Sequence, residues 1–230
     1  MKKKSKKKKA LIAVFVIFVV LGVVIGVFVY NMHVPKNLGV KVSKEAYDSA
    51  LKKLNLDKDT DKEVLDVDAR LTSEEVTSLL GYNKSEDSAL QKVQVRVNKD
   101  DTVDFSGVVN KEFLLETMLG GSVSEESLLE SAPALKYLPN KLTVYFNFSG
   151  EVVNNTTDIT VNKASLMGVG LPKSLYKKKD MQESINNALS SFLKEQAEQN
   201  KGSFDMVKPQ DGELVVKGQL PATAFQNSGN

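Results

Sequence analysis

The sequence contains few side chains with the chemistry that catalysis or zinc binding requires. Its 230 residues include one histidine, His33, and no cysteine. No thiolate is therefore available, and a zinc site of the usual kind is not expected. A serine nucleophile needs an activating base, and the G-x-S-x-G segment that presents such a serine in many hydrolases is absent. We therefore predict no catalytic residue, no cofactor and no enzyme activity.

One acidic run has a faint likeness to a calcium-binding loop. Asp57, Asp59 and Asp61 alternate as the first ligands of such a loop do. The loop also needs a glycine at its sixth position and a glutamate at its twelfth. Lys62 and Asp68 occupy those positions here. A solvated loop is the simpler interpretation, and no metal site is predicted.

The clearest signal in the chain concerns its location. Seven lysines stand among the first nine residues, and residues 10–30 then run without a charge. About 20 apolar residues are enough to span the hydrocarbon core of a bilayer, and a basic flank favours the cytoplasmic side. The run is longer than the apolar part of a signal peptide and ends without a clear cleavage site. We favour an uncleaved signal anchor over a cleaved signal peptide, with the remainder of the chain extracytoplasmic.

The net charge of the chain is also set by its first residues. The whole chain carries +2, to which the seven lysines contribute +7, so the remainder carries −5. Nucleic-acid binding requires a basic surface on the folded domain, so nucleic acid is not an expected partner. The lysines are suited instead to anionic lipid headgroups. A cysteine-free, lysine-rich chain with a single span suggests the cell membrane of a Gram-positive bacterium.

Hydrophobic periodicity predicts helices and hairpins in alternation after the anchor. The predicted elements are a helix capped by Ser43, a helix opening at Thr72 with Glu75 in a capping box, a hairpin over 90–109, two short helices over 110–130, a hairpin over 141–172, a helix over 181–199 and a hairpin over 203–221. This order favours an α+β domain with a curved antiparallel sheet packed on helices. The predicted organisation is a basic cytoplasmic tail at 1–9, a transmembrane signal anchor at 10–30, a juxtamembrane linker at 31–42, one extracytoplasmic domain at 43–222 and a flexible tail at 223–230.

Two elements present apolar faces that must be covered. The segment KLTVYFNFSG at 141–150 alternates apolar and polar residues, and the helix over 181–199 carries an apolar stripe. These faces either pack directly as a core or leave a groove between sheet and helix. The candidates for lining such a groove are Phe146, Phe148, Leu166, Met167, Ile185, Leu189 and Phe192.

Several phrases together resemble a known kind of bacterial domain. They are LTSEEVTSLL, VQVRVNKDDTVDFSGVV, LTVYFNFSGEV, MGVGLPKSL and DGELVVKGQLP, and the similarity covers roughly residues 65–222. They are similar to membrane-anchored, single-span domains of unknown function that resemble tubular lipid-binding (TULIP-like) domains. The resemblance implies a long curved sheet around a helix, with an apolar groove that binds membrane lipids or other amphiphiles. The alternative is a structural or regulatory module that binds a cell-envelope or wall-synthesis protein through its outer surface.

Overall fold

The structure is a computed structural model that describes residues 34–57, 62–82, 84–85, 88–113 and 139–224. The predicted tail at 1–9, the anchor at 10–30 and the first three linker residues lie outside these ranges, as do most of the two helices predicted over 110–130. Among the helices that the structure describes, none combines the length and the apolar character that crossing a bilayer requires.

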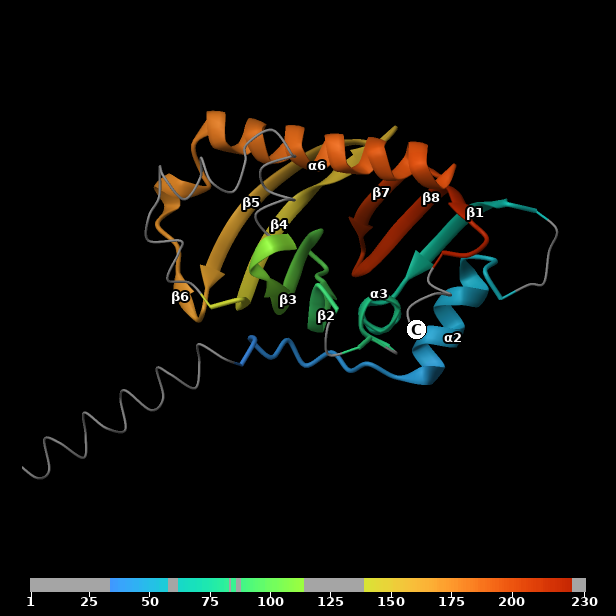
Figure 1. Cartoon of the computed structure of the whole chain (residues 1–230), viewed down its shortest axis with the longest axis horizontal. Coiled ribbons are helices and arrows are strands. Elements are labelled where there is room, and N and C mark those ends of the chain that lie inside the picture. Colours follow the sequence, from blue (N-terminus) through green and yellow to red (C-terminus); the bar gives the residue numbers. More distant parts are fainter. Residues whose placement is uncertain (1–33, 58–61, 83, 86–87, 114–138, 225–230) are drawn as a thin grey trace, which may run out of the picture.

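The described residues form an α+β fold around one strongly curled antiparallel sheet (Figure 1). The strand order is β1-β8-β7-β4-β3-β2, with β5 on the other edge of β4 and β6 beside β5. The strands are β1 (Val64–Leu71), β2 (Leu90–Val97), β3 (Thr102–Asn110), β4 (Lys141–Val153), β5 (Thr156–Leu166), β6 (Val169–Gly170), β7 (Ser203–Gln210) and β8 (Glu213–Pro221). The helices are α2 (Lys44–Lys53), α3 (Ser73–Gly81), the short 3-10 helix η2 (Lys173–Leu175) and α6 (Lys179–Asn200).

The three predicted hairpins are confirmed, as are the helix starts at Ser43 and Thr72. The Ser43 side chain accepts a hydrogen bond from the backbone of Ala46, and Thr72 and Glu75 form the full capping box. The turn between β4 and β5 consists of Asn154 and Asn155, with φ values of 50° and 57°. Asparagine tolerates this left-handed region, and two such residues in succession match the twist of a tight hairpin.

Strand β1 was not among the predicted elements. Its residues 64–71 follow the polar run at 57–63. In the structure β1 pairs along its whole length with β8. Val67, Ala69 and Leu71 are buried and alternate with exposed charged residues, because successive side chains of a strand point to opposite faces of the sheet. The alternation was visible in the sequence, but alternate positions held by alanine and aspartate are a weak strand signal.

The sheet curls where glycines allow a sharp bend. β4 pairs with β3 as far as Ser149 and then with β7 from Val152. Gly150 lies between these two partners with a φ of 123°. A β-carbon there would lie 2.0 Å from the carbonyl oxygen of Asp158, so only glycine fits. Curvature of this kind lets one sheet face enclose other elements.

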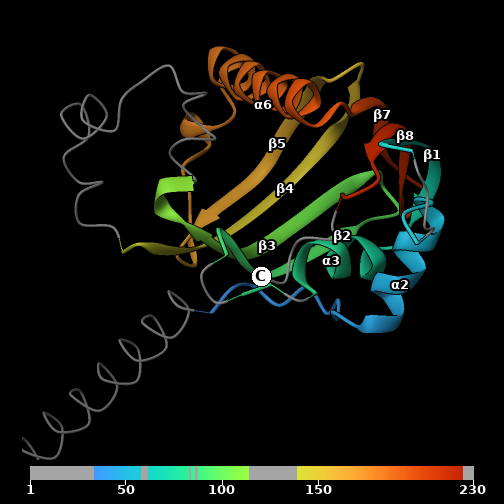
Figure 2. The ribbon, with the colours of Figure 1, turned by 45° about the vertical axis from the view of Figure 1, so that its right-hand side comes forward.

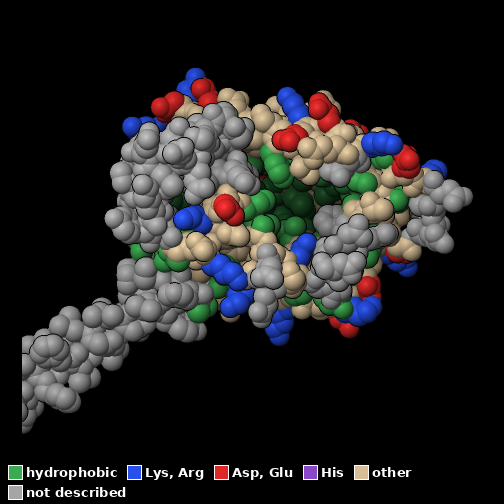
Figure 3. Space-filling model, in the orientation of Figure 1, with side chains coloured by type: hydrophobic (Ala, Val, Ile, Leu, Met, Phe, Trp, Pro, Cys, Tyr) green, Lys and Arg blue, Asp and Glu red, His purple; other side chains and the backbone are tan. Residues whose placement is uncertain are grey.

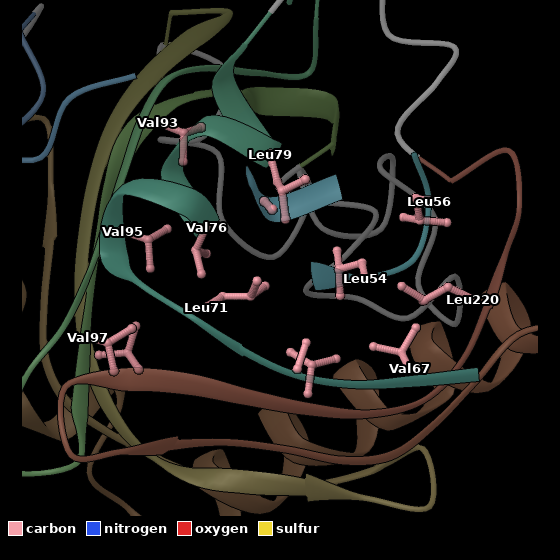
Figure 4. Close-up of a cluster of buried hydrophobic side chains, with 14 residues drawn as sticks. Leu54, Leu56, Val67, Leu71, Val76, Leu79, Val93, Val95, Val97 and Leu220 are labelled. Carbon is pink, nitrogen blue, oxygen red and sulfur yellow. The ribbon is translucent and has the colours of Figure 1, made fainter. Parts of the chain in front are cut away.

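Helices α2 and α3 fill one half of the curl. Their apolar residues pack between β1 and β8 on one side and β2 and β3 on the other, and Leu54 is the largest fully buried side chain of this cluster (Figure 4). Burial of a valine or leucine contributes about 1.5–3 kcal/mol to folding. This cluster is the main core, and it leaves the half of the curl next to β5 to be covered by α6 (Figure 2).

Residues 34–42, predicted as a linker, lie against the outer face of the sheet. Leu38 and Val40 are buried beside Tyr145 of β4, and the Lys36 ammonium lies 3.6 Å from the centre of the Tyr145 ring. The Leu38 amide also donates to the Gln94 side chain, at 2.6 Å. Burial and a hydrogen bond to Asp104 raise the pKa of Tyr145 to about 12, so its hydroxyl remains a donor. The chain is therefore held on the domain from its first described residues.

Candidate ligand-binding cavity

Helix α6 is held against the exposed edge of β5 by its polar side chains. The side-chain oxygen of Asn186 accepts from the Ile159 amide at 2.8 Å, and its nitrogen donates to the Ile159 carbonyl at 3.0 Å. Gln182 accepts from the Val161 amide one helical turn earlier, at 3.1 Å. Ser190 accepts from the Thr157 amide one turn later, at 2.9 Å.

These contacts set the distance between helix and sheet. Positions 182, 186 and 190 follow one line along α6, and positions 161, 159 and 157 follow the same edge of β5. The helix therefore replaces a neighbouring strand and satisfies buried backbone groups that would otherwise be costly. Its apolar residues face the interior of the curl, where Ile185 packs against a buried cluster that contains Val161 and Ala164 of β5.

An apolar cavity of about 420 Å³ lies between α6 and the sheet. Figure 3 shows hydrophobic side chains gathered in a hollow below α6. The cavity is lined by β2, β3, β4, β5, α6 and Phe113, which follows β3. Its lining residues are Leu90, Phe105, Val109, Phe113, Phe146, Phe148, Ile159, Val161, Ile185, Ala188 and Leu189.

The lining determines what this cavity can do. Every lining side chain is hydrocarbon, so none can act as an acid, a base, a nucleophile or a metal ligand. In the part of the chain that the structure describes, no group of three or more His, Cys, Asp or Glu side chains is placed to hold a metal ion. The volume lies within the roughly 300–1,000 Å³ of small-molecule pockets. The cavity is therefore suited to a hydrocarbon group.

Four of the seven predicted groove residues line the cavity. They are Phe146, Phe148, Ile185 and Leu189. The other three, Leu166, Met167 and Phe192, are not part of its lining. Leu166 lies at the end of β5 and Met167 in the tight turn to β6, so both lie beyond the cavity along the strand.

The remaining lining residues differ in how far the sequence could indicate them. Phe105 lies opposite Phe146 because β3 pairs with β4, although some 40 residues separate them along the chain. Ile159 and Val161 could have been predicted from the sequence, since they lie two residues apart on one face of a predicted strand. Ala188 was not predicted, because a small side chain stands out little in a hydrophobic stripe. It nevertheless lines the cavity.

Comparisons with known proteins add no relative. No protein-family model, no curated protein and no solved structure matches this chain. The cavity and the elements around it must therefore be interpreted on their own chemistry.

Proposed function

We propose that this protein is a membrane-anchored, extracytoplasmic binding module that takes the hydrocarbon part of a lipid or another amphiphile into the cavity below α6. This function involves no catalysis. The ligand is held by exclusion of water from its chain, and its polar group remains outside the apolar lining.

The observation that carries this proposal is the cavity itself. A volume of about 420 Å³ with a wholly hydrocarbon lining is unfavourable to leave filled with water. Removing apolar surface from water lowers the free energy by about 25 cal/mol per Å². A hydrocarbon chain gains this energy without needing a polar partner in the site.

Two features of the sequence support the same function. The apolar run at 10–30 is long enough to anchor the chain in a bilayer, which would hold the cavity close to a supply of lipid. The resemblance to TULIP-like domains, carried by phrases such as LTVYFNFSGEV, implies a groove of this kind.

A photoreactive lipid tests the proposal in the full chain. The protein is reconstituted in nanodiscs that contain a phospholipid with a diazirine in its acyl chain, irradiated and digested, and the labelled peptides are identified by mass spectrometry. We expect labelling within 141–161 and 179–200 in addition to the anchor. Labelling confined to the apolar run at 10–30 would sink the proposal and favour a module that binds through its outer surface.

A matched pair of variants separates the cavity from general contact with lipid. Ala188→Phe places an aromatic ring in the cavity, whereas Ser191→Phe places the same ring at an exposed position three residues further along α6. We expect Ala188→Phe to lower labelling of 141–161 several-fold and Ser191→Phe to leave it unchanged. Equal labelling in the two variants contradicts the proposal.

A further inference from the structure

The first described residues fix which end of the domain is nearest the predicted anchor. The apolar run ends at Tyr30, and four residues of extended chain reach at most about 14 Å further, to Val34. Val34 lines a small cavity of about 220 Å³ together with Ser165 and Gly168, at the end of β5 and the turn to β6. Because Leu38 and Val40 are buried against the sheet, this end cannot swing freely away from the anchor.

The same end carries exposed apolar side chains. Val169 of β6 is 48% exposed and Met181, in the first turn of α6, is 39% exposed. The Leu171 amide donates to the Ala164 carbonyl at 2.9 Å, which holds the segment after β6 against the end of β5. β6 and the start of α6 both lie on the left side of Figure 1, β6 at its lower part and the start of α6 at its upper part. We call residues 163–181 the basic end.

The basic end carries a positive net charge, whereas residues 10–230 together carry a negative one. Residues 163–181 contain five lysines and one acidic residue, Asp180, whereas the chain beyond the first nine residues carries −5. Four exposed lysines stand within the seven positions 173–179: Lys173, Lys177, Lys178 and Lys179.

These lysines are only weakly engaged within the protein. Lys179 pairs with Glu183 at 3.7 Å, but the two side chains are 91% and 61% exposed. Such a surface pair contributes little and can exchange for another anion. Lys177 lies 3.4 Å from the Asn162 side-chain oxygen, a long and exposed contact. The ammonium groups are therefore available to a negatively charged surface.

We propose that the basic end docks on the anionic surface of the bilayer that holds the anchor, with Val169 and Met181 entering the headgroup layer and the lysines contacting anionic lipid. The short connection to Tyr30 and the complementary charge select a membrane over other partners. This inference goes beyond the proposed function, since it needs no ligand in the cavity. It rests on the predicted anchor.

The absence of cysteine permits a site-specific test in the full chain. Val169→Cys and Val153→Cys each introduce one thiol for a fluorescent label. Val153 is the matched control because it is also exposed, at 39%, and lies at the opposite end of the β4–β5 hairpin. About ten residues of β5 separate the two ends, or roughly 30 Å. Each protein is reconstituted in nanodiscs of phosphatidylcholine with or without phosphatidylglycerol, containing a headgroup-level spin-labelled lipid as quencher.

We expect the label at position 169 to be quenched in the anionic nanodiscs and the label at position 153 to remain unquenched. A lysine near an anionic surface contributes roughly fivefold to binding. The double variant Lys173→Gln/Lys178→Gln should therefore lower the docked-to-undocked ratio by roughly 25-fold. The control double variant Lys52→Gln/Lys99→Gln removes two exposed lysines elsewhere and should have no effect.

Three results would overturn docking through the basic end. One is equal quenching of the labels at positions 169 and 153, which would show no preferred orientation. Another is quenching that neither phosphatidylglycerol nor the Lys173→Gln/Lys178→Gln variant changes. The third is a label at position 169 that stays in water in both nanodiscs, as expected if the lysines serve an acidic protein partner instead. None of these results bears on whether the cavity labels with lipid, so the two proposals fail separately.

Discussion

The side chain of Asn186 on α6 forms two hydrogen bonds with the backbone of Ile159 on β5, one to its amide and one to its carbonyl. The hydroxyl of Thr77 on α3 also forms two hydrogen bonds with the backbone of one residue, Val95 of β2. It accepts from the Val95 amide at 2.8 Å and donates to the Val95 carbonyl at 3.0 Å. β2 ends the main strand order of the sheet and β5 is its outer branch. Helix side chains thus satisfy backbone groups that would otherwise invite pairing with another chain.

Replacing Asn186 tests whether this contact holds the helix in place. Asn186→Ala removes both bonds and leaves the Ile159 amide and carbonyl unsatisfied, so we expect a loss of roughly 1–3 kcal/mol in the free energy of unfolding. Chemical denaturation of the full chain in detergent measures this loss. Hydrogen exchange should show faster opening at residues 157–161 than in the unmodified protein.

The neighbouring Asn187 provides the control for that prediction. It is exposed, and Asn187→Ala makes the same chemical change on the outer side of α6. Surface substitutions of this kind usually change stability by less than 0.5 kcal/mol. Equal losses in the two variants would mean that helix propensity, and not the contact with β5, accounts for the effect.

The sequence was sufficient to predict helix α6 but not to predict where the helix packs. The apolar stripe with Ile185 and Leu189 predicted an amphipathic helix, and the structure contains it. Gln182, Asn186 and Ser190 are polar and spaced by four, which in a sequence is typical of a solvated face. They bond to β5 instead, and no local pattern distinguishes an amide that faces water from one that replaces a strand.

The cavity was predictable only in part, for a related reason. Phe146 and Phe148 could be identified because alternation within one strand assigns its faces. Phe105 could not, because its place depends on the pairing of β3 with β4 and on the curl at Gly150. Alternation also could not show whether the apolar faces touch. In the structure Ile185 of α6 packs beside Val161 and Phe146, while a cavity lies next to them.

Truncation of Leu38 tests whether residues 34–42 belong to the folded domain. Leu38 is 2% exposed, and Leu38→Ala should lower the free energy of unfolding by roughly 2–5 kcal/mol. Trypsin cleavage after Lys36 or Lys41 in the full chain should become faster. Val42→Ala is the control, since Val42 is 42% exposed. A Leu38→Ala protein as stable and as resistant as the control would show that the segment is a linker.

Gly150 tests the origin of the sheet curvature. Gly150→Ala places a β-carbon 2.0 Å from the Asp158 carbonyl in a backbone conformation that other residues rarely adopt. We expect a loss of more than about 3 kcal/mol, because backbone atoms on β5 must move. Gly170→Ala is the control, since its β-carbon would meet nothing within 4 Å. Thermal unfolding compares the two, and similar midpoints would contradict this account of the bend.

Glu75 connects the two helices of the main core through its carboxylate. It accepts from the Lys53 ammonium at 2.8 Å, the Ser49 hydroxyl at 2.7 Å and the Thr72 amide at 2.7 Å. Burial alone would raise its pKa, but these hydrogen bonds outweigh burial and hold the pKa below its ordinary value of 4.5. The folded protein therefore binds this proton less readily than the unfolded chain does.

This difference predicts how stability depends on pH. The stabilisation from ionised Glu75 is present above pH 4.5 and is lost as the pH falls through the lower pKa of the folded state. Glu75→Gln should be less stable than the unmodified protein by about 1–2 kcal/mol at pH 7, and the gap should close as the pH falls below 4.5. Glu74→Gln, at an exposed neighbouring position, should follow the unmodified protein throughout. A gap for Glu75→Gln that stays constant down to pH 3 would show that its carboxylate is not held ionised by Lys53, Ser49 and Thr72.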